Sequence, residues 1–107
     1  MKTLNLCDGA MRASQIILGC MRISNMEDSA VETLVRTAME QGINFFDHAD
    51  IYGGGRSESV FARAIHMNPA LREKMILQSK CGIRPGQYDF SKEHILSSVE
   101  GSLKRLN

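Results

Sequence analysis

Three short apolar runs alternate along the chain with segments whose apolar residues recur every three to four positions. The runs lie at residues 16–19, 44–47 and 75–80. The first is apolar without a break, as is typical of a strand buried on both faces of a parallel sheet, whereas the longer spacing predicts amphipathic helices. This alternation predicts an α/β fold with right-handed crossovers and with helices outside a parallel sheet.

Each predicted helix has its own start signal. Ser24 and Glu27 have the spacing of a capping box, and Gly42 fits the closing cap of the same helix. Ser57 and Ser91 can cap two further helices through their hydroxyl oxygens. The predicted buried faces comprise Val31, Leu34, Val35, Ala38 and Met39 in the first helix, Val60, Phe61, Ala64 and Ile65 in the second, and Ile95, Val99, Leu103 and Leu106 in the third.

The remaining segments predict turns and loops. Residues 4–13 predict an N-terminal hairpin, because Asp8 and Gly9 supply the positive φ that a tight hairpin turn needs. Asn68 and Pro69 mark a loop before the third run. Residues 81–90, which include two glycines and a proline, predict another loop before the last helix.

Composition limits the class of protein and partner. A chain of 107 residues makes at most one domain, and a formal charge of +1 without a basic block gives no footprint for nucleic acid or an anionic membrane. Small molecules are therefore the expected partners. The three cysteines show neither paired nor zinc-binding spacing, and the N-terminus has no apolar leader, so we predict free thiols in the cytoplasm.

A candidate site follows from the polar residues at the ends of the predicted strands. Asp47 ends the second strand, Tyr52 follows it, and Lys80 ends the third. Because the carboxyl ends of neighbouring parallel strands lie at one edge, these side chains can converge. An ammonium near a phenol favours the phenolate, and a carboxylate holds the ammonium in place, which suits the phenol to general acid catalysis.

Simpler explanations exist for each of these residues. Asp47 can serve as a turn residue that bonds the backbone, and Tyr52 can fill the core. Lys80 is harder to explain in this way, because lysine is rarely placed against a core without a partner. The glycine run 53–55 with Arg56 can cradle a phosphate, but it matches neither the P-loop nor the G-x-G-x-x-G pattern, so a permissive turn is the favoured explanation.

The chain resembles the aldo-keto reductase family in several motifs that occur in the family's order. The main one is GINFFDHADIYG with SE at residues 42–53 and 57–58, and the others are LGCMR at 18–22, ILQSK at 76–80 and LKRL at 103–106. This resemblance implies a (β/α)₈ TIM barrel and NADPH-dependent reduction of an aldehyde or ketone to an alcohol. It implies catalytic roles for Asp47, Tyr52 and Lys80.

In that family, hydride passes to the carbonyl carbon while a tyrosine protonates the oxygen. The resemblance implies that Tyr52 is the proton donor, that Lys80 tunes it, and that Asp47 orients Lys80. No metal is implied.

The resemblance also implies cofactor contacts at the end of the first strand. It assigns Gly19, Cys20 and Met21, together with Asp47, to the binding of NADPH. Cys20 stands where a threonine is common in the family, and His48 stands where a serine or threonine is common.

Residues 1–107 are expected to form only the N-terminal part of such a barrel, namely the hairpin and three β-α units of an incomplete, truncated barrel. The family's fourth catalytic position, a histidine on the fourth strand, has no counterpart here. We therefore expect the chain alone to be inactive and to associate with itself through open sheet edges. The alternative is a non-catalytic nucleotide-sensing or assembly module derived from a reductase.

Overall fold

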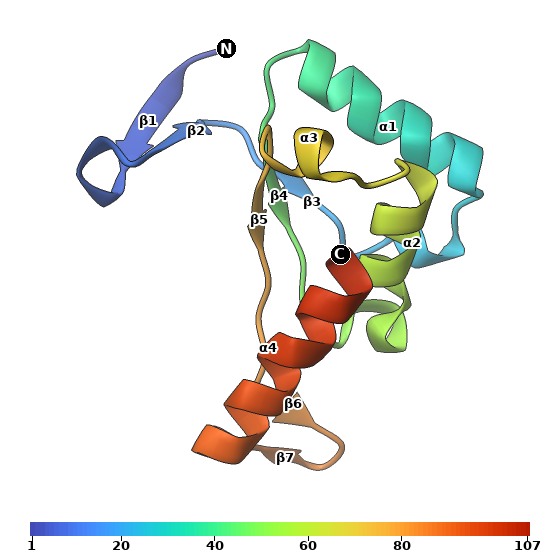
Figure 1. The fold of residues 1–107 in the computed structure, drawn as a ribbon. Coiled ribbons are helices and arrows are strands. Elements are labelled where there is room, and N and C mark those ends of the chain that lie inside the picture. Colours follow the sequence, from blue (N-terminus) through green and yellow to red (C-terminus); the bar gives the residue numbers. More distant parts are fainter.

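A three-stranded parallel sheet lies at the centre of the computed structural model, which describes residues 1–107 (Figure 1). Its strand order is β3-β4-β5, with β3 at Leu18–Gly19, β4 at Phe45–Asp47 and β5 at Ile76–Gln78. Phe46 pairs with Leu18 on one side and with Leu77 on the other. The predicted α/β class is thus confirmed, and the sheet is open, with β3 and β5 at its edges.

Helices follow the strands of this sheet and lie against one of its faces. These helices are α1 at Asp28–Glu40, α2 at Arg56–Ala64, the short α3 at Pro69–Arg72 and α4 at Lys92–Leu106. In Figure 1, α1 and α2 stand together on one side of the strands. The core lies between these helices and the sheet: Phe46 of β4 and Phe61 of α2 are fully buried, with ring centroids 5.3 Å apart.

The first helix confirms the predicted buried face and the closing cap but not the predicted start. Val31, Val35 and Ala38 are buried. Gly42 has φ +88°, and its N–H and that of Ile43 bond to the carbonyls of Met39 and Ala38, which is a Schellman motif.

The capping box predicted at Ser24 and Glu27 is wrong. Glu27 is itself the N-cap, without a side-chain bond, and Ser24 lies in the separate 3-10 turn Ile23–Asn25.

The other caps give mixed outcomes. Ser91 accepts a bond from the His94 N–H at 3.2 Å and caps α4 as predicted. Ser57 caps nothing, because α2 begins one residue earlier and Gly55 is its N-cap. Asn68 was predicted to mark a loop, but it is the N-cap of the short helix α3, because its side chain accepts a hydrogen bond from the Leu71 N–H at 2.9 Å.

Two hairpins flank the parallel sheet. The predicted N-terminal hairpin is confirmed as β1 at Thr3–Leu6 paired with β2 at Met11–Ser14. The second hairpin, β6 at Ile83–Arg84 with β7 at Gln87–Tyr88, lies where the sequence predicted only a loop. Its strands are two residues long, too short to leave an alternating pattern in the sequence.

Some apolar residues predicted to be buried are exposed. Ile16 and Ile17 precede the paired residues of β3 and are 56% and 46% exposed, so the prediction of burial on both faces is wrong there. On α4 only Leu106 is buried, whereas Val99 and Leu103 are 48% and 64% exposed. None of the helices has the length and apolar character that crossing a membrane requires.

The glycine turn after β4 gives a test of local packing. Gly53 and Gly54 both have left-handed φ, +61° and +66°. A Cβ at Gly53 would lie 2.6 Å from the Ser24 side chain, while a Cβ at Gly54 would meet nothing within 4 Å. We expect Gly54→Ala to lower the free energy of unfolding by about 1 kcal/mol through backbone strain, and Gly53→Ala by about 1 kcal/mol more.

Urea unfolding followed by circular dichroism measures both values. Ser24→Gly in the Gly53→Ala background should recover most of the additional loss, because it removes the two nearest atoms that the new methyl group meets and leaves only Ser57 Oγ, at 3.3 Å. Equal losses in the two alanine variants would contradict the close approach of Ser24.

Candidate active site

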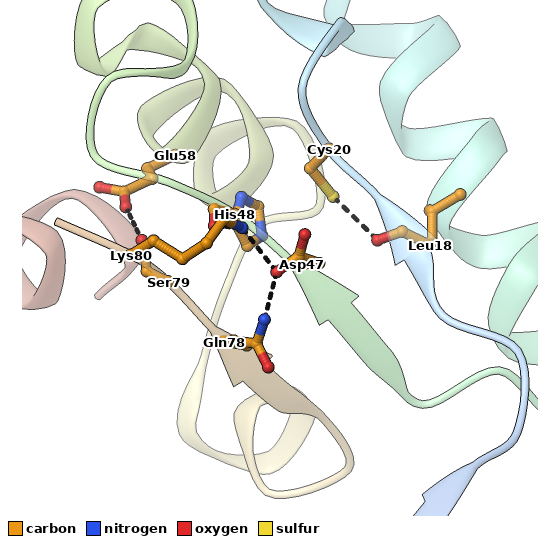
Figure 2. A network of polar contacts seen from close by, with 8 residues as sticks. All are labelled: Leu18, Cys20, Asp47, His48, Glu58, Gln78, Ser79 and Lys80. Atoms are coloured by element: carbon orange, nitrogen blue, oxygen red, sulfur yellow. Dashed lines mark hydrogen bonds and ion pairs between the residues drawn. The ribbon is translucent and has the colours of Figure 1, made fainter. Parts of the chain in front are cut away.

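The register of β4 and β5 brings Asp47 and Lys80 together. Asp47 lies opposite Gln78 in the parallel ladder, and Lys80 follows two residues later, so its side chain points to the same face. Its Nζ lies 2.8 Å from Asp47 Oδ1 and donates a second bond, of 2.6 Å, to the His48 carbonyl oxygen. Figure 2 shows the lysine reaching across the strand ends to the carboxylate.

Tyr52 completes the predicted set. It opens the 3-10 turn Tyr52–Gly55, which is held to the end of β4 by a bond from its N–H to the Ala49 carbonyl at 3.1 Å. Lys80 Nζ lies over the tyrosine ring, 5.0 Å from its centroid. The structure therefore brings Asp47, Tyr52 and Lys80 into one cluster.

The charge state of Lys80 follows from these contacts. Partial burial acts to lower the pKa of Lys80, but the interactions with Asp47 and Tyr52 outweigh it and raise the pKa above its ordinary value. The side chain is 45% exposed, so solvent screens the pair. Lys80 thus presents a fixed positive charge to the phenol at neutral pH.

Gln78 is a member of the cluster that the sequence analysis missed. Its Nε2 donates to Asp47 Oδ1 at 2.6 Å, the same oxygen that Lys80 contacts (Figure 2). Gln78 Nε2 and Lys80 Nζ both donate to Oδ1, which leaves Oδ2 of Asp47 available as an acceptor. The period of two along a strand could have indicated this residue, because Gln78 and Lys80 must share a face.

Two cavities adjoin Lys80. The smaller, of about 150 Å³, is also lined by Tyr52, Ile51 and Ile83. The larger, of about 250 Å³, lies between the end of β5 and α4 and does not include Tyr52. Chemistry that needs both the phenol and the ammonium therefore fits the smaller cavity, which both residues line.

Besides Asp47, three residues were predicted to bind the cofactor, and they have different environments. Gly19 lies opposite Asp47 in the ladder, and the space that a side chain would take there is free of atoms within 4 Å. Met21 is exposed. Cys20 is fully buried: its N–H donates to the Asp47 carbonyl oxygen at 2.9 Å, and its sulfur lies 3.6 Å from the Leu18 carbonyl oxygen.

The Cys20 thiol is also electrostatically protected. Burial raises its pKa to about 12, and the nearby charge of Asp47 adds to this effect. The thiol therefore stays protonated and unreactive at neutral pH.

His48 is a buried neighbour of the cluster. Its ring is fully buried and packs edge-on against Phe61, with centroids 4.6 Å apart, and neither ring nitrogen has a hydrogen-bond partner. Burial lowers the pKa of His48 to about 4, although the charges of Glu58 and Asp47 act to raise it. The imidazole is therefore neutral at physiological pH.

Glu58 forms a second polar network on the helix side of β5. Its carboxylate is fully buried and accepts bonds from Ser79 Oγ, Ser102 Oγ and Arg105 Nε at 2.5, 2.9 and 2.7 Å. Burial acts to raise the pKa of Glu58, but these bonds outweigh it and lower the pKa below its ordinary value. No local pattern predicts this network, because its members are up to 47 residues apart.

Comparison with known proteins identifies a family to which the chain is similar. The sequence model described as "Aldo/keto reductase family" matches residues 15–107. The chain is 40% identical to an uncharacterized oxidoreductase of Bacillus subtilis, YcsN, over 90% of this chain and 36% of that protein. The chain thus spans about a third of the length of this curated relative.

Solved structures of aldo-keto reductases are also similar to this chain. A structure from Pseudomonas aeruginosa assigned to the aldo-keto reductases has a TM-score of 0.81 and 35% identity, covering 97% of this chain and 41% of that one. The holo form of an aldo-keto reductase from Bacillus halodurans, AKR11C1, has a TM-score of 0.81 and 29% identity, covering 99% of this chain and 36% of that one.

The buried imidazole gives a pH-dependent stability. An unfolded histidine titrates near pH 6.5, whereas folded His48 stays neutral down to about pH 4, so the unfolded state binds the extra proton between these values. This contribution to stability is complete above about pH 6.5 and is lost as the pH falls. The free energy of unfolding should therefore be lower at pH 5 than at pH 7.5 by about 2 kcal/mol.

Urea unfolding at pH 7.5 and pH 5 measures this loss. His48→Gln, which cannot take up a proton, should lose about 2 kcal/mol less than the wild type over the same interval. An equal loss in both proteins would show that His48 titrates normally in the fold.

Proposed function

This chain belongs to the aldo/keto reductase family, and on that premise we propose that it supplies the proton-donating part of an NADPH-dependent carbonyl reductase. One observation carries the proposal: Lys80 Nζ lies 2.8 Å from Asp47 and over the ring of Tyr52. A carboxylate, an ammonium and a phenol arranged in this order make a proton donor with a fixed positive charge beside it.

In the proposed reaction, Tyr52 gives its hydroxyl proton to the carbonyl oxygen of an aldehyde or ketone. The phenolate that remains is stabilised by the ammonium of Lys80. Asp47 keeps Lys80 charged and holds it beside the ring. The smaller cavity next to Tyr52, with Ile51 and Ile83 in its wall, would hold the apolar part of the substrate.

The residues at the ends of β3 and β4 fit a nicotinamide nucleotide, the cofactor that the family typically uses. Asp47 Oδ2 is available to accept from a hydroxyl group, and the open space over Gly19 adjoins it. We propose that Gly19, Met21 and Asp47 contact NADPH, and that the buried Cys20 belongs to the same cofactor-binding segment through its N–H bond to the Asp47 carbonyl oxygen. When bound, the nucleotide supplies the hydride that the carbonyl carbon receives.

We further propose that residues 1–107 form the N-terminal part of a (β/α)₈ barrel domain. The support is the parallel order β3-β4-β5 and the likeness to longer aldo-keto reductases, of which the chain covers 36% to 41%. Carbonyl reduction would then require the rest of the barrel, and the 107 residues alone would be inactive. The three free cysteines fit a cytoplasmic location, which is part of the proposal.

The role of Tyr52 can be tested in a chimera in which residues 1–107 precede the remaining barrel of the B. subtilis relative. Tyr52→Phe should lower kcat for reduction of a reactive aldehyde by about 10²–10⁴-fold, because it removes only the proton donor. Oxidation of NADPH, followed by absorbance, measures the rate.

Tyr88→Phe is the matched control, since Tyr88 is 75% exposed and lies outside the cluster. It should leave the rate unchanged. Unchanged activity in Tyr52→Phe would remove the proton-donor assignment. Nucleotide binding without turnover in the chimera would favour a nucleotide-sensing module, and turnover by the 107-residue chain would refute its proposed inactivity.

We also propose that copies of the 107-residue chain associate through its open edges. Strands β3 and β5 each pair only with β4, and exposed edges of this kind invite pairing with another chain. Next to the β5 edge, Val99 and Leu103 line the larger cavity and are exposed. A second copy seated there would cover both the strand edge and this apolar surface.

Sedimentation velocity over a range of concentrations tests the association. Leu103→Lys should weaken it by about tenfold or more, because it places a charge in the apolar contact. Leu96→Lys is the control, since Leu96 lies on the same helix and is 54% exposed but does not line the cavity. A wild-type chain that stays monomeric at all concentrations would exclude the proposal.

A further inference from the structure

The Glu58 network joins three elements that are distant in the sequence. Glu58 lies in the first turn of α2, Ser79 follows the end of β5, and Ser102 and Arg105 belong to α4. Arg105 also donates to Ser102 Oγ at 3.3 Å, so the two α4 residues support each other. A single carboxylate thus holds α2, β5 and α4 together.

Stability alone is a poor explanation for this arrangement. Desolvation of a buried carboxylate costs free energy, and its ion pair often does no more than offset that cost. Apolar side chains of similar volume would join α2 to α4 at least as well. A carboxylate with several directional bonds, in contrast, fixes the positions of its donors.

One of those donors is adjacent to Lys80. Ser79 points to the helix side of β5, whereas its neighbours Gln78 and Lys80 point to the site side, as alternation along an extended chain requires. In Figure 2 Ser79 reaches Glu58, while Gln78 and Lys80 both reach Asp47. The bond from Ser79 Oγ to Glu58 therefore anchors the backbone from which Lys80 projects.

This anchor lies beyond the last paired residue of β5, where the backbone has less support. The ladder with β4 ends at Gln78. Beyond it, two backbone bonds tie the chain to the segment after β4: the His48 N–H donates to the Gln78 carbonyl at 2.8 Å, and the Asp50 N–H donates to the Lys80 carbonyl at 3.0 Å. These bonds restrain one side of the segment. The Ser79 hydroxyl supplies the restraint on the other side.

We propose that Glu58 is a positioning residue for Lys80, acting through Ser79, with Arg105 and Ser102 holding the carboxylate in place. The proposal rests on the proposed role of Lys80 beside Tyr52. In this arrangement the last turns of α4 help to support the site. No residue of α4 forms a hydrogen bond or ion pair with Asp47 or Tyr52. A merely structural network would join the helices without affecting Lys80.

Two alanine variants separate these possibilities. Ser79→Ala and Ser102→Ala each remove one hydroxyl bond to the same oxygen of Glu58, and Ser102→Ala also removes the acceptor of a bond from Arg105, so Ser102→Ala should lower the unfolding midpoint at least as much. Only Ser79 is attached to the backbone of Lys80. Nuclear magnetic resonance of the Lys80 ammonium group in the 107-residue chain reports its hydrogen bonding without any need for activity.

We expect Ser79→Ala to move the titration of Lys80 to lower pH and to make exchange of its ammonium protons about threefold faster. Ser102→Ala should leave both unchanged, and Ser79→Thr, which keeps the hydroxyl, should restore the wild-type values. Amide spectra of each variant verify that it is folded.

Equal changes at Lys80 in the two alanine variants, or no change in either, would overturn the proposal. The Tyr52→Phe assay is independent of this measurement. If Ser79→Ala moves the titration of Lys80 while Tyr52→Phe leaves the rate unchanged, the positioning role of Glu58 stands and the proposed function fails. The two failures are therefore distinguishable.

Discussion

Alternation along β4 is the constraint on which the site depends. Phe46 faces the helices and is fully buried against Phe61, and the next residue, Asp47, must then face the opposite side. A shift of the register by one residue would place the carboxylate in the core and the phenylalanine in the site, which the free energy of burial prevents. Packing of one aromatic ring therefore fixes the orientation of the cluster of Asp47, Tyr52 and Lys80.

The same alternation explains how much of the structure could be predicted from the sequence. The apolar runs and helical spacings predicted the parallel sheet and the buried faces of α1 and α2, because burial of apolar area dominates both. The convergence of Asp47, Tyr52 and Lys80 followed from the rule that parallel strands end at one edge. The ends of elements were harder: Ser24 and Ser57 looked like caps, but the helices begin at Asp28 and Arg56.

The partners that the sequence did not predict have physical features in common. Gln78 and the Glu58 network depend on side chains from separate elements meeting at hydrogen-bond distance, which no local spacing encodes. The exposed apolar residues of α4 had the spacing of a buried face, yet only Leu106 is covered within this chain. Periodicity indicates which face of a helix is apolar, but not what lies opposite that face.

Strand β5 separates two polar networks that have opposite requirements. On the site side, Lys80 and Asp47 remain partly exposed, so their charges can interact with a ligand; on the helix side, Glu58 is sealed from solvent. Because low dielectric strengthens directional bonds, the sealed network is the stiffer of the two. A rigid buried network behind an accessible one lets Lys80 keep its position while the face that carries Asp47 stays open.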